Sequence, residues 1–126
     1  MPKIGIDIKS GKIKKNVVAG IDLGTTNSLI AFINENGDPY VLEEDGHLLV
    51  PSVIYLGDQK LVGMEALPYL LSQPEETIYS IKRFLGKSYQ DLSAKKFNYT
   101  VIDDGSENLV KIKANDSFYS PIELSA

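Results

Sequence analysis

The stretch Gly20–Ser28, which reads GIDLGTTNS, decides how this sequence is interpreted. It places a carboxylate, Asp22, at the end of an apolar run, then a glycine, and then hydroxyl and amide side chains. Glycine permits a sharp turn, and free backbone N–H groups and hydroxyls can then surround an oligophosphate. Asp22 would face the accompanying Mg²⁺ through water, because this ion releases its water reluctantly. The stretch therefore predicts a phosphate-binding turn, and the nine residues together disfavour the alternative, a simple Gly-Thr hairpin with a solvated aspartate.

The residues around this turn predict a three-stranded antiparallel meander. Val17–Asp22 and Leu29–Ile33 are short runs rich in β-branched and apolar residues, joined by the turn itself. Asn36-Gly37 follows, the dipeptide that most readily adopts the positive φ angles of a two-residue hairpin turn. Tyr40–Leu42 then returns as the third strand.

The remainder of the chain predicts a mixture of short strands and helices. Pro68 is expected to break or kink one of the helices, and Gly86 is expected to end another. The predicted elements are a strand at Ser52–Leu56 with a partner at Lys60–Gly63, helices at Met64–Leu71, Glu75–Leu85 and Tyr89–Lys96, and a second hairpin formed by Phe97–Ile102 and Leu109–Lys113.

Composition excludes several kinds of chemistry. The 126 residues include no cysteine and one histidine. A disulfide framework, a thiol nucleophile, a cysteine-ligated zinc site and any site that needs two histidines are therefore excluded. No apolar run approaches the roughly 20 residues of a membrane span, and the first residues lack a signal-peptide core. These features predict a cytoplasmic protein without a membrane partner.

Charge is unevenly distributed along the chain. The net charge is −4, yet the first fifteen residues contain five lysines and one aspartate. We expect residues 1–16 to be a flexible, lysine-rich leader, with an arm for an acidic partner as the alternative. The remaining, acidic part contains a single arginine, which gives no support for nucleic-acid binding.

The last residues predict the beginning of a helix. Ser120 is suited to be an N-cap, Pro121 stands at the first helical position, and Glu123 has the spacing of a capping box. Only three residues follow, whereas an average helix has about three turns. We therefore expect residues 17–126 to be the N-terminal part of a longer domain, truncated at a helix start; a frayed natural terminus is the alternative.

Several segments together resemble one protein family. Gly20–Ser28 resembles the first phosphate loop of the seventy-kilodalton heat-shock chaperones, the DnaK-like family, in the form that carries Asn27. The lysine-rich leader resembles the HscA-like branch, whereas Val50 departs from the family's usual threonine. The other matching segments, in chain order, are Val50–Val53 ("TPS"), Val62–Ala66 ("IGxxA"), Thr77–Gly86 ("T-x-x-x-x-KR-x-x-G") and Ser120–Ser125 ("TPEEIS").

The resemblance implies an α/β fold, that of an actin-like (ribonuclease H-like) ATPase lobe, here as a meander with flanking helices and a second hairpin. It implies ATP or ADP and Mg²⁺ as cofactors, bound where two lobes close. It also implies three kinds of partner for the full protein: client polypeptides, a J-domain co-chaperone and a nucleotide-exchange factor. Because the chain would hold only part of the ATPase domain, we expect it alone to hydrolyse no ATP and to bind ATP weakly or not at all.

The resemblance also assigns roles to individual residues. Gly24, Thr25, Thr26 and Asn27 would hold the phosphates, and Asp22 would help to place the metal.

Lys82 is the second catalytic residue that the resemblance implies, beside Asp22. In a helix over Glu75–Leu85 it would lie at the margin of an apolar stripe, where a lysine can also extend to solvent. In the resembled family, the lysine at this position points into the nucleotide cleft near the γ-phosphate and the attacking water. Lys82 would therefore stabilise charge and position water.

Two other interpretations of the sequence remain open at this stage. A sugar or metabolite kinase of the same actin-like superfamily can have a similar first loop, although Lys82-Arg83 and Val62–Ala66 favour the chaperone. A non-catalytic structural module is the other alternative.

Overall fold

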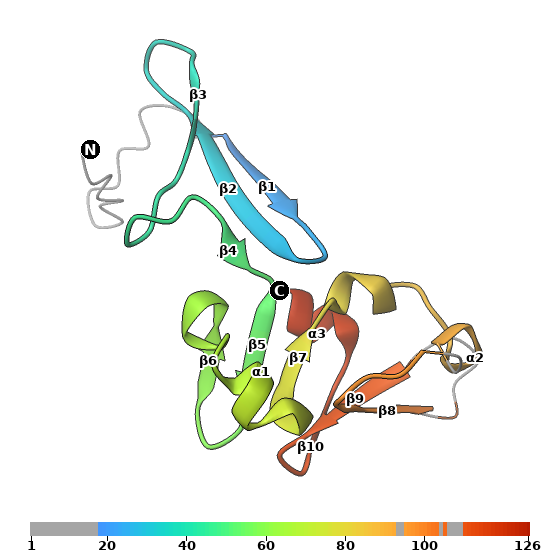
Figure 1. Cartoon of the computed structure of the whole chain (residues 1–126). Helices are drawn as coiled ribbons and strands as arrows, with labels where there is room; N and C mark the ends of the chain where they lie inside the picture. The colour runs from blue at the N-terminus through green and yellow to red at the C-terminus, as the bar shows by residue number, and fades with distance from the viewer. Residues whose placement is uncertain (1–17, 93–94, 104, 106–109) are drawn as a thin grey trace, which may run out of the picture.

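The computed structural model describes residues 18–92, 95–103, 105 and 110–126 (Figure 1). The expected leader, residues 1–16, lies outside this part of the chain. The described residues form three antiparallel sheets connected by short helices, which agrees with the mixed α and β structure predicted from the sequence. None of the helices in the described part is long and apolar enough to cross a bilayer.

The first sheet contains the predicted meander. Its strands follow in the order β1-β2-β3, and β4 pairs with the other end of β2. We call this sheet the arm, because it projects from the remaining residues, the body, in Figure 1. Its strands are β1 (Ala19–Leu23), β2 (Asn27–Ile33), β3 (Pro39–Val41) and β4 (Val50–Pro51).

The prediction of a two-residue turn at Asn36-Gly37 was wrong. Only Gly37 has a positive φ, of 89°, and the connection is wider than two residues because β2 ends at Ile33 and β3 begins at Pro39. The side chain of Asn34 stabilises this wider turn, since its Oδ1 accepts hydrogen bonds from two backbone N–H groups within it.

A turn with two positive φ angles occurs instead at Asp45-Gly46, where the angles are 48° and 82°. It closes an isolated bridge between Glu44 and His47.

The body contains two further three-stranded sheets. One has the order β6-β5-β7 and the other β10-β9-β8. The second contains the predicted hairpin and an additional strand, β10, that was not predicted from the sequence. The strands are β5 (Val53–Leu56), β6 (Lys60–Val62), β7 (Thr77–Tyr79), β8 (Thr100–Asp103), β9 (Val110–Ala114) and β10 (Ser117–Tyr119).

All described helices are short. The predicted break at Pro68 is confirmed, because the segment around it splits into η1 and α1. The capping box is also confirmed: Glu123 N donates to Ser120 Oγ, and Ser120 N donates to the Glu123 carboxylate. The helices are η1 (Gly63–Glu65), α1 (Tyr69–Ser72), η2 (Pro74–Glu76), η3 (Ile81–Phe84), α2 (Tyr89–Leu92) and α3 (Pro121–Ser125).

The predicted helix at Glu75–Leu85 was wrong. Its residues divide among η2, strand β7 and η3. Thr77–Tyr79 pairs with β5, and Thr77, which has no exposed surface, donates a hydrogen bond through its hydroxyl to the Gln73 carbonyl. The expected stop at Gly86 is retained, because this glycine has a φ of 68° just after η3.

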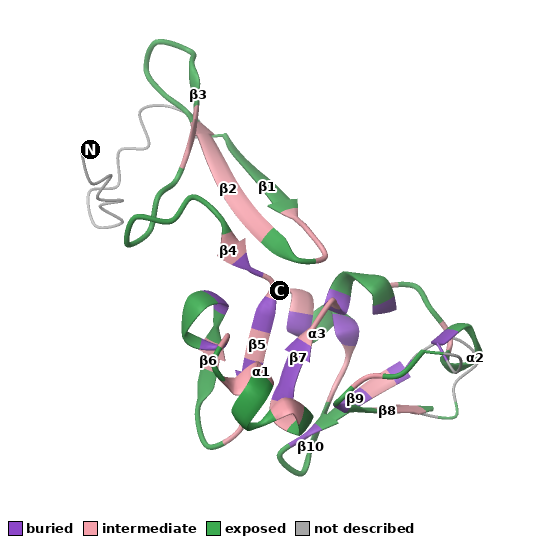
Figure 2. Ribbon diagram, in the orientation of Figure 1, coloured by how far each residue is buried: buried purple, intermediate pink, exposed green. Residues whose placement is uncertain are grey.

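The hydrophobic core lies in the body. Figure 2 shows buried residues on β5, β7, β9 and α3, whereas the arm is half-buried or exposed along most of its length. Burying these side chains against one another is the main favourable contribution to folding. The principal cluster is Leu56, Ile78, Ile81, Phe84, Leu92, Tyr99, Val110, Ile112, Ala114 and Leu124.

Candidate functional site

The turn between β1 and β2 requires its glycine. A Cβ atom at Gly24 would overlap the carbonyl oxygen of Asn27, so any other residue would have to open the turn. The turn therefore brings Thr25, Thr26 and Asn27 together at the end of the arm that meets the body (Figure 1). We refer to residues 24–28 as the loop.

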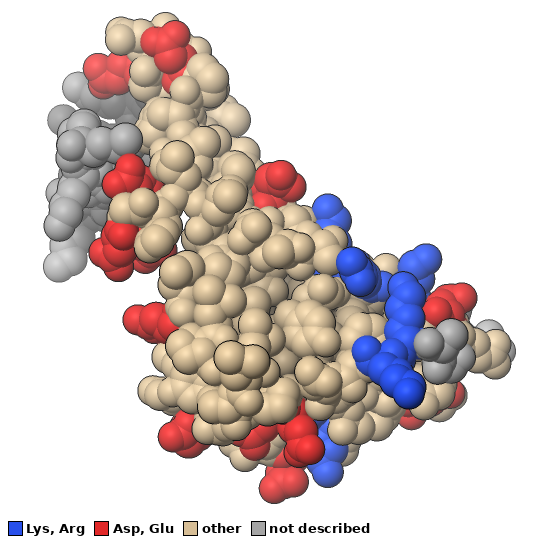
Figure 3. Space-filling model, in the orientation of Figure 1, with Lys and Arg blue, Asp and Glu red and all other residues tan. Residues whose placement is uncertain are grey.

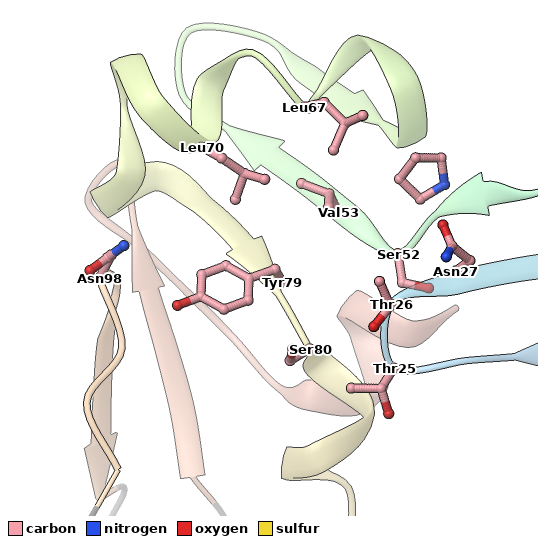
Figure 4. A pocket seen from close by; sticks show the side chains of 11 residues that line it. Thr25, Thr26, Asn27, Ser52, Val53, Leu67, Leu70, Tyr79, Ser80 and Asn98 are labelled. Carbon is pink, nitrogen blue, oxygen red and sulfur yellow. The ribbon is translucent and has the colours of Figure 1, made fainter.

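The loop forms one wall of a pocket with a volume of about 460 Å³. Most of its polar lining residues gather on one side in Figure 4, where Thr25 and Thr26 lie near Ser52 and Ser80, whereas Asn98 lies on the opposite side. Most of the remaining lining is apolar. The lining residues are Thr25, Thr26, Asn27, Pro51, Ser52, Val53, Leu67, Leu70, Tyr79, Ser80 and Asn98.

Ser52, which lies between β4 and β5, is hydrogen-bonded to the loop. Its backbone N–H donates to the Thr26 carbonyl at 2.8 Å. Its hydroxyl donates to the Gly24 carbonyl at 2.9 Å, and its Oγ lies 2.8 Å from Ser28 Oγ. The loop is thus attached to the segment that joins the arm to the body.

The sequence predicted Lys82 at the margin of an apolar helical stripe, but no such helix forms around it. It belongs to η3, its side chain is exposed, and it is not among the residues that line the pocket. Ser80, two residues earlier, does line the pocket and has a left-handed backbone conformation with φ of 56°. This residue turns the chain out of β7 and into η3, where Lys82 is the second residue.

Asp22 also lies outside the pocket lining. It is exposed, near the end of β1, and pairs with Leu29 across the strands. The oxygen atoms in this region, from a carboxylate, two threonine hydroxyls and an amide, are the hard donors that Mg²⁺ prefers. Across the described residues, no three Asp, Glu or His side chains come together. The donor chemistry of Asp22 and the loop is thus compatible with Mg²⁺.

A tyrosine behind the pocket supports its wall. The Tyr99 hydroxyl donates a hydrogen bond of 2.6 Å to the carbonyl of Tyr79, a lining residue. The two rings also meet edge to face, with 5.4 Å between their centroids. Burial, with a contribution from Tyr79, raises the pKa of Tyr99 well above that of a free tyrosine, although Arg83 opposes the shift. The hydroxyl therefore stays protonated and able to donate.

Positive charge collects beside this site. Figure 3 shows Lys and Arg side chains gathered around η3, while Asp and Glu side chains are spread over the arm, the region of α2 and the far end of the body. η3 contributes the exposed Lys82 and Arg83. Such a concentration favours anionic ligands near the pocket.

The structure brings together part of the predicted site. Thr25, Thr26 and Asn27 line one pocket, whereas Asp22, Gly24 and Lys82 lie outside its lining. The sequence did not predict that Tyr79, Ser80 and Asn98 also line this pocket. The only signal for Ser52 was its place in the segment that resembles "TPS".

Comparison with known proteins gives a consistent result. Residues 18–126 match the family described as Hsp70 protein. The chain is 38% identical over 112 residues to a "Chaperone protein HscA homolog" of Histophilus somni, which covers 87% of this chain and 18% of that protein. It is 41% identical over 111 residues to a "Chaperone protein DnaK" of Thermus thermophilus, covering 85% of this chain and 18% of that protein. The chain thus spans about a fifth of the length of these relatives, and the matches do not favour the kinase alternative.

Proposed function

The chain belongs to the Hsp70 family, and on this basis we propose that it is the N-terminal part of the ATPase domain of an ATP-dependent chaperone. The actin-like lobe expected from the sequence is part of this proposal, as is the boundary of the folded part at residue 17. The parent protein would use ATP binding and hydrolysis to control its hold on client polypeptides.

The observation that carries the proposal is the position of the loop. Its Thr25, Thr26 and Asn27 meet Ser80 at one pocket, and Lys82 follows Ser80 by two residues in η3. Hydroxyl, amide and backbone N–H groups can donate hydrogen bonds to phosphate oxygens. We assign these three residues, with the turn that Gly24 permits, to phosphate binding.

Lys82 and Asp22 complete the proposed site. The Lys82 ammonium would offset the charge that develops on the γ-phosphate and help to orient the attacking water. Asp22 would hold Mg²⁺ through water, and the ion would neutralise phosphate charge when it is bound. Both side chains are exposed, so a nucleotide and the rest of the ATPase domain can approach them.

The partners follow from the family and are proposed for the whole protein. They are unfolded client polypeptides, a J-domain co-chaperone and a nucleotide-exchange factor. The cytoplasmic location inferred from composition also remains a prediction. Because most of the length of the relatives is not represented, we propose that this chain alone does not hydrolyse ATP.

A chimera tests the proposed function. Residues 18–126 would replace the matching segment of the Thermus thermophilus DnaK protein. We expect the chimera to hydrolyse ATP, and Lys82→Ala to lower its kcat by roughly 100-fold or more, the size of effect typical of a lost charge-stabilising group. Lys87→Ala is the matched control, because Lys87 is also an exposed lysine close to η3.

Thr25→Ala tests the loop separately and should weaken Mg·ATP binding. A folded chimera without ATPase activity would contradict the proposed function, and equal activities for the Lys82→Ala and Lys87→Ala variants would contradict the role of Lys82.

A further inference from the structure

Ser52 contacts the loop at three of its residues. The hydroxyl donates to the Gly24 carbonyl, the backbone N–H donates to the Thr26 carbonyl, and the side chain meets Ser28 Oγ. Of these hydrogen bonds, the two that involve the hydroxyl are partly buried. One residue of the body thus holds the beginning, the middle and the end of the turn.

These contacts fix the direction of peptide groups. In a trans peptide the carbonyl and the N–H of the next residue point in opposite directions, and the described residues contain no cis peptide bond. Because the Gly24 carbonyl points at Ser52, the N–H of Thr25 points away from it. The Thr26 carbonyl fixes the N–H of Asn27 in the same way.

We propose that Ser52 is a positioning residue for the phosphate-binding loop, holding the N–H groups of Thr25 and Asn27 in the orientation that phosphate oxygens require. The assignment of the loop to phosphate rests on the proposed function, whereas the effect of Ser52 on the loop's order does not. Ser52 itself touches no phosphate, since its hydroxyl hydrogen is used on Gly24.

Ser52→Ala removes the hydroxyl and retains the backbone N–H. Ser125→Ala is a matched control, because the Ser125 hydroxyl also donates a partly buried hydrogen bond to a backbone carbonyl, that of Pro121, in α3. Ser52→Cys is a second variant of nearly the same size that keeps a weak donor.

The first measurement is ¹⁵N relaxation of the 126-residue chain. We expect order parameters near the rigid value of about 0.85 for Thr25 and Asn27, a fall toward about 0.6 in Ser52→Ala and a smaller fall in Ser52→Cys. Ser125→Ala should leave these two residues unchanged. Equal order parameters in the unchanged chain and in both Ser52 variants would overturn the proposal.

The second measurement is Mg·ATP affinity in the DnaK chimera. Ser52→Ala removes both hydrogen bonds of the hydroxyl, so we expect it to raise the Kd by about fivefold or more, and Ser125→Ala to leave the Kd unchanged. If the chimera with Ser52 intact binds no Mg·ATP, the proposed function fails, and the relaxation data still decide whether Ser52 orders the loop. If Ser52→Ala and Ser125→Ala change the Kd equally, the positioning role is refuted.

Discussion

Replacing Tyr99 with phenylalanine tests whether one hydroxyl group holds the wall of the pocket. Tyr99 has 4% of its surface exposed, and its hydroxyl lies 2.6 Å from the Tyr79 carbonyl oxygen. Phenylalanine retains the ring contacts with Tyr79, Phe84 and Phe97. The substitution therefore removes one hydrogen bond and little else.

The expected cost follows from that single loss. A hydrogen bond contributes about 1 kcal/mol net, and a carbonyl left without its donor adds to the cost. We expect the free energy of unfolding to fall by about 1 to 2 kcal/mol. With a urea m-value of about 2 kcal/mol/M, the unfolding midpoint should fall by roughly 0.5 to 1 M.

Urea titration followed by circular dichroism measures this change. Tyr99→Leu, which also removes the aromatic contacts, should cost more, about 3 kcal/mol. An unchanged midpoint in Tyr99→Phe, with an unchanged m-value, would refute the claim that the hydroxyl supports the pocket wall.

The same variant should alter the response to alkali. Burial raises the pKa of Tyr99 in the folded chain, so above about pH 10 the unfolded chain loses this proton first. The stability that protonated Tyr99 contributes is therefore complete below about pH 10 and is lost as the pH rises above that value. Tyr99→Phe should show a smaller loss of stability between about pH 9 and 11 than the unchanged chain, and equal losses would contradict this account.

Three further substitutions give separate tests. Gly24→Ala would force the loop open, so we expect shifted NMR signals for residues 24–28 and a melting temperature lower by roughly several degrees. Gly20→Ala is the control, because a Cβ atom added there meets nothing within 4 Å. Hydrogen bonds at the helix N-cap lower the pKa of Glu123. Its contribution to the free energy of unfolding is therefore present above about pH 4.3 and is lost as the pH falls through the lowered pKa. Acid unfolding of Glu123→Gln should lack this pH-dependent loss of stability. Ile21 is 73% exposed on strand β1, which pairs only with β2 in the described part of the chain. We therefore expect the chain to self-associate more as its concentration rises, and Ile21→Lys to self-associate less. Sedimentation of the unchanged chain as a monomer at all concentrations would argue against this.

Local sequence patterns predicted most strands but misassigned one helix. The apolar positions Ile78, Ile81 and Leu85 have helical spacing, yet Thr77–Tyr79 is also a run of β-branched and aromatic residues. Pairing with β5 decided between these two possibilities. Such pairing depends on a strand more than twenty residues earlier, which no local window contains.

The candidate site, like the fold, could be predicted only in part. The loop was predictable because its glycine, hydroxyl and amide residues are consecutive in the sequence. Its surroundings were not, because Ser52 contacts Gly24 from 28 residues away, and Ser80 and Asn98 lie still further along the chain. The left-handed conformation of Ser80 was also unpredictable, since serine has no intrinsic preference for it.

The wide sequence separation of the pocket walls has a consequence for the order of folding. The lining begins at Thr25 and ends at Asn98, and it draws on the arm, on strands β5 and β7 of the body and on the segment that precedes β8. Contacts between distant segments form after local hairpins, because closing long loops costs conformational entropy before any contact repays it. The β1–β2 hairpin can therefore form early, whereas its turn gains the hydrogen bonds to Ser52, and the pocket its other walls, only after the arm and the body have met.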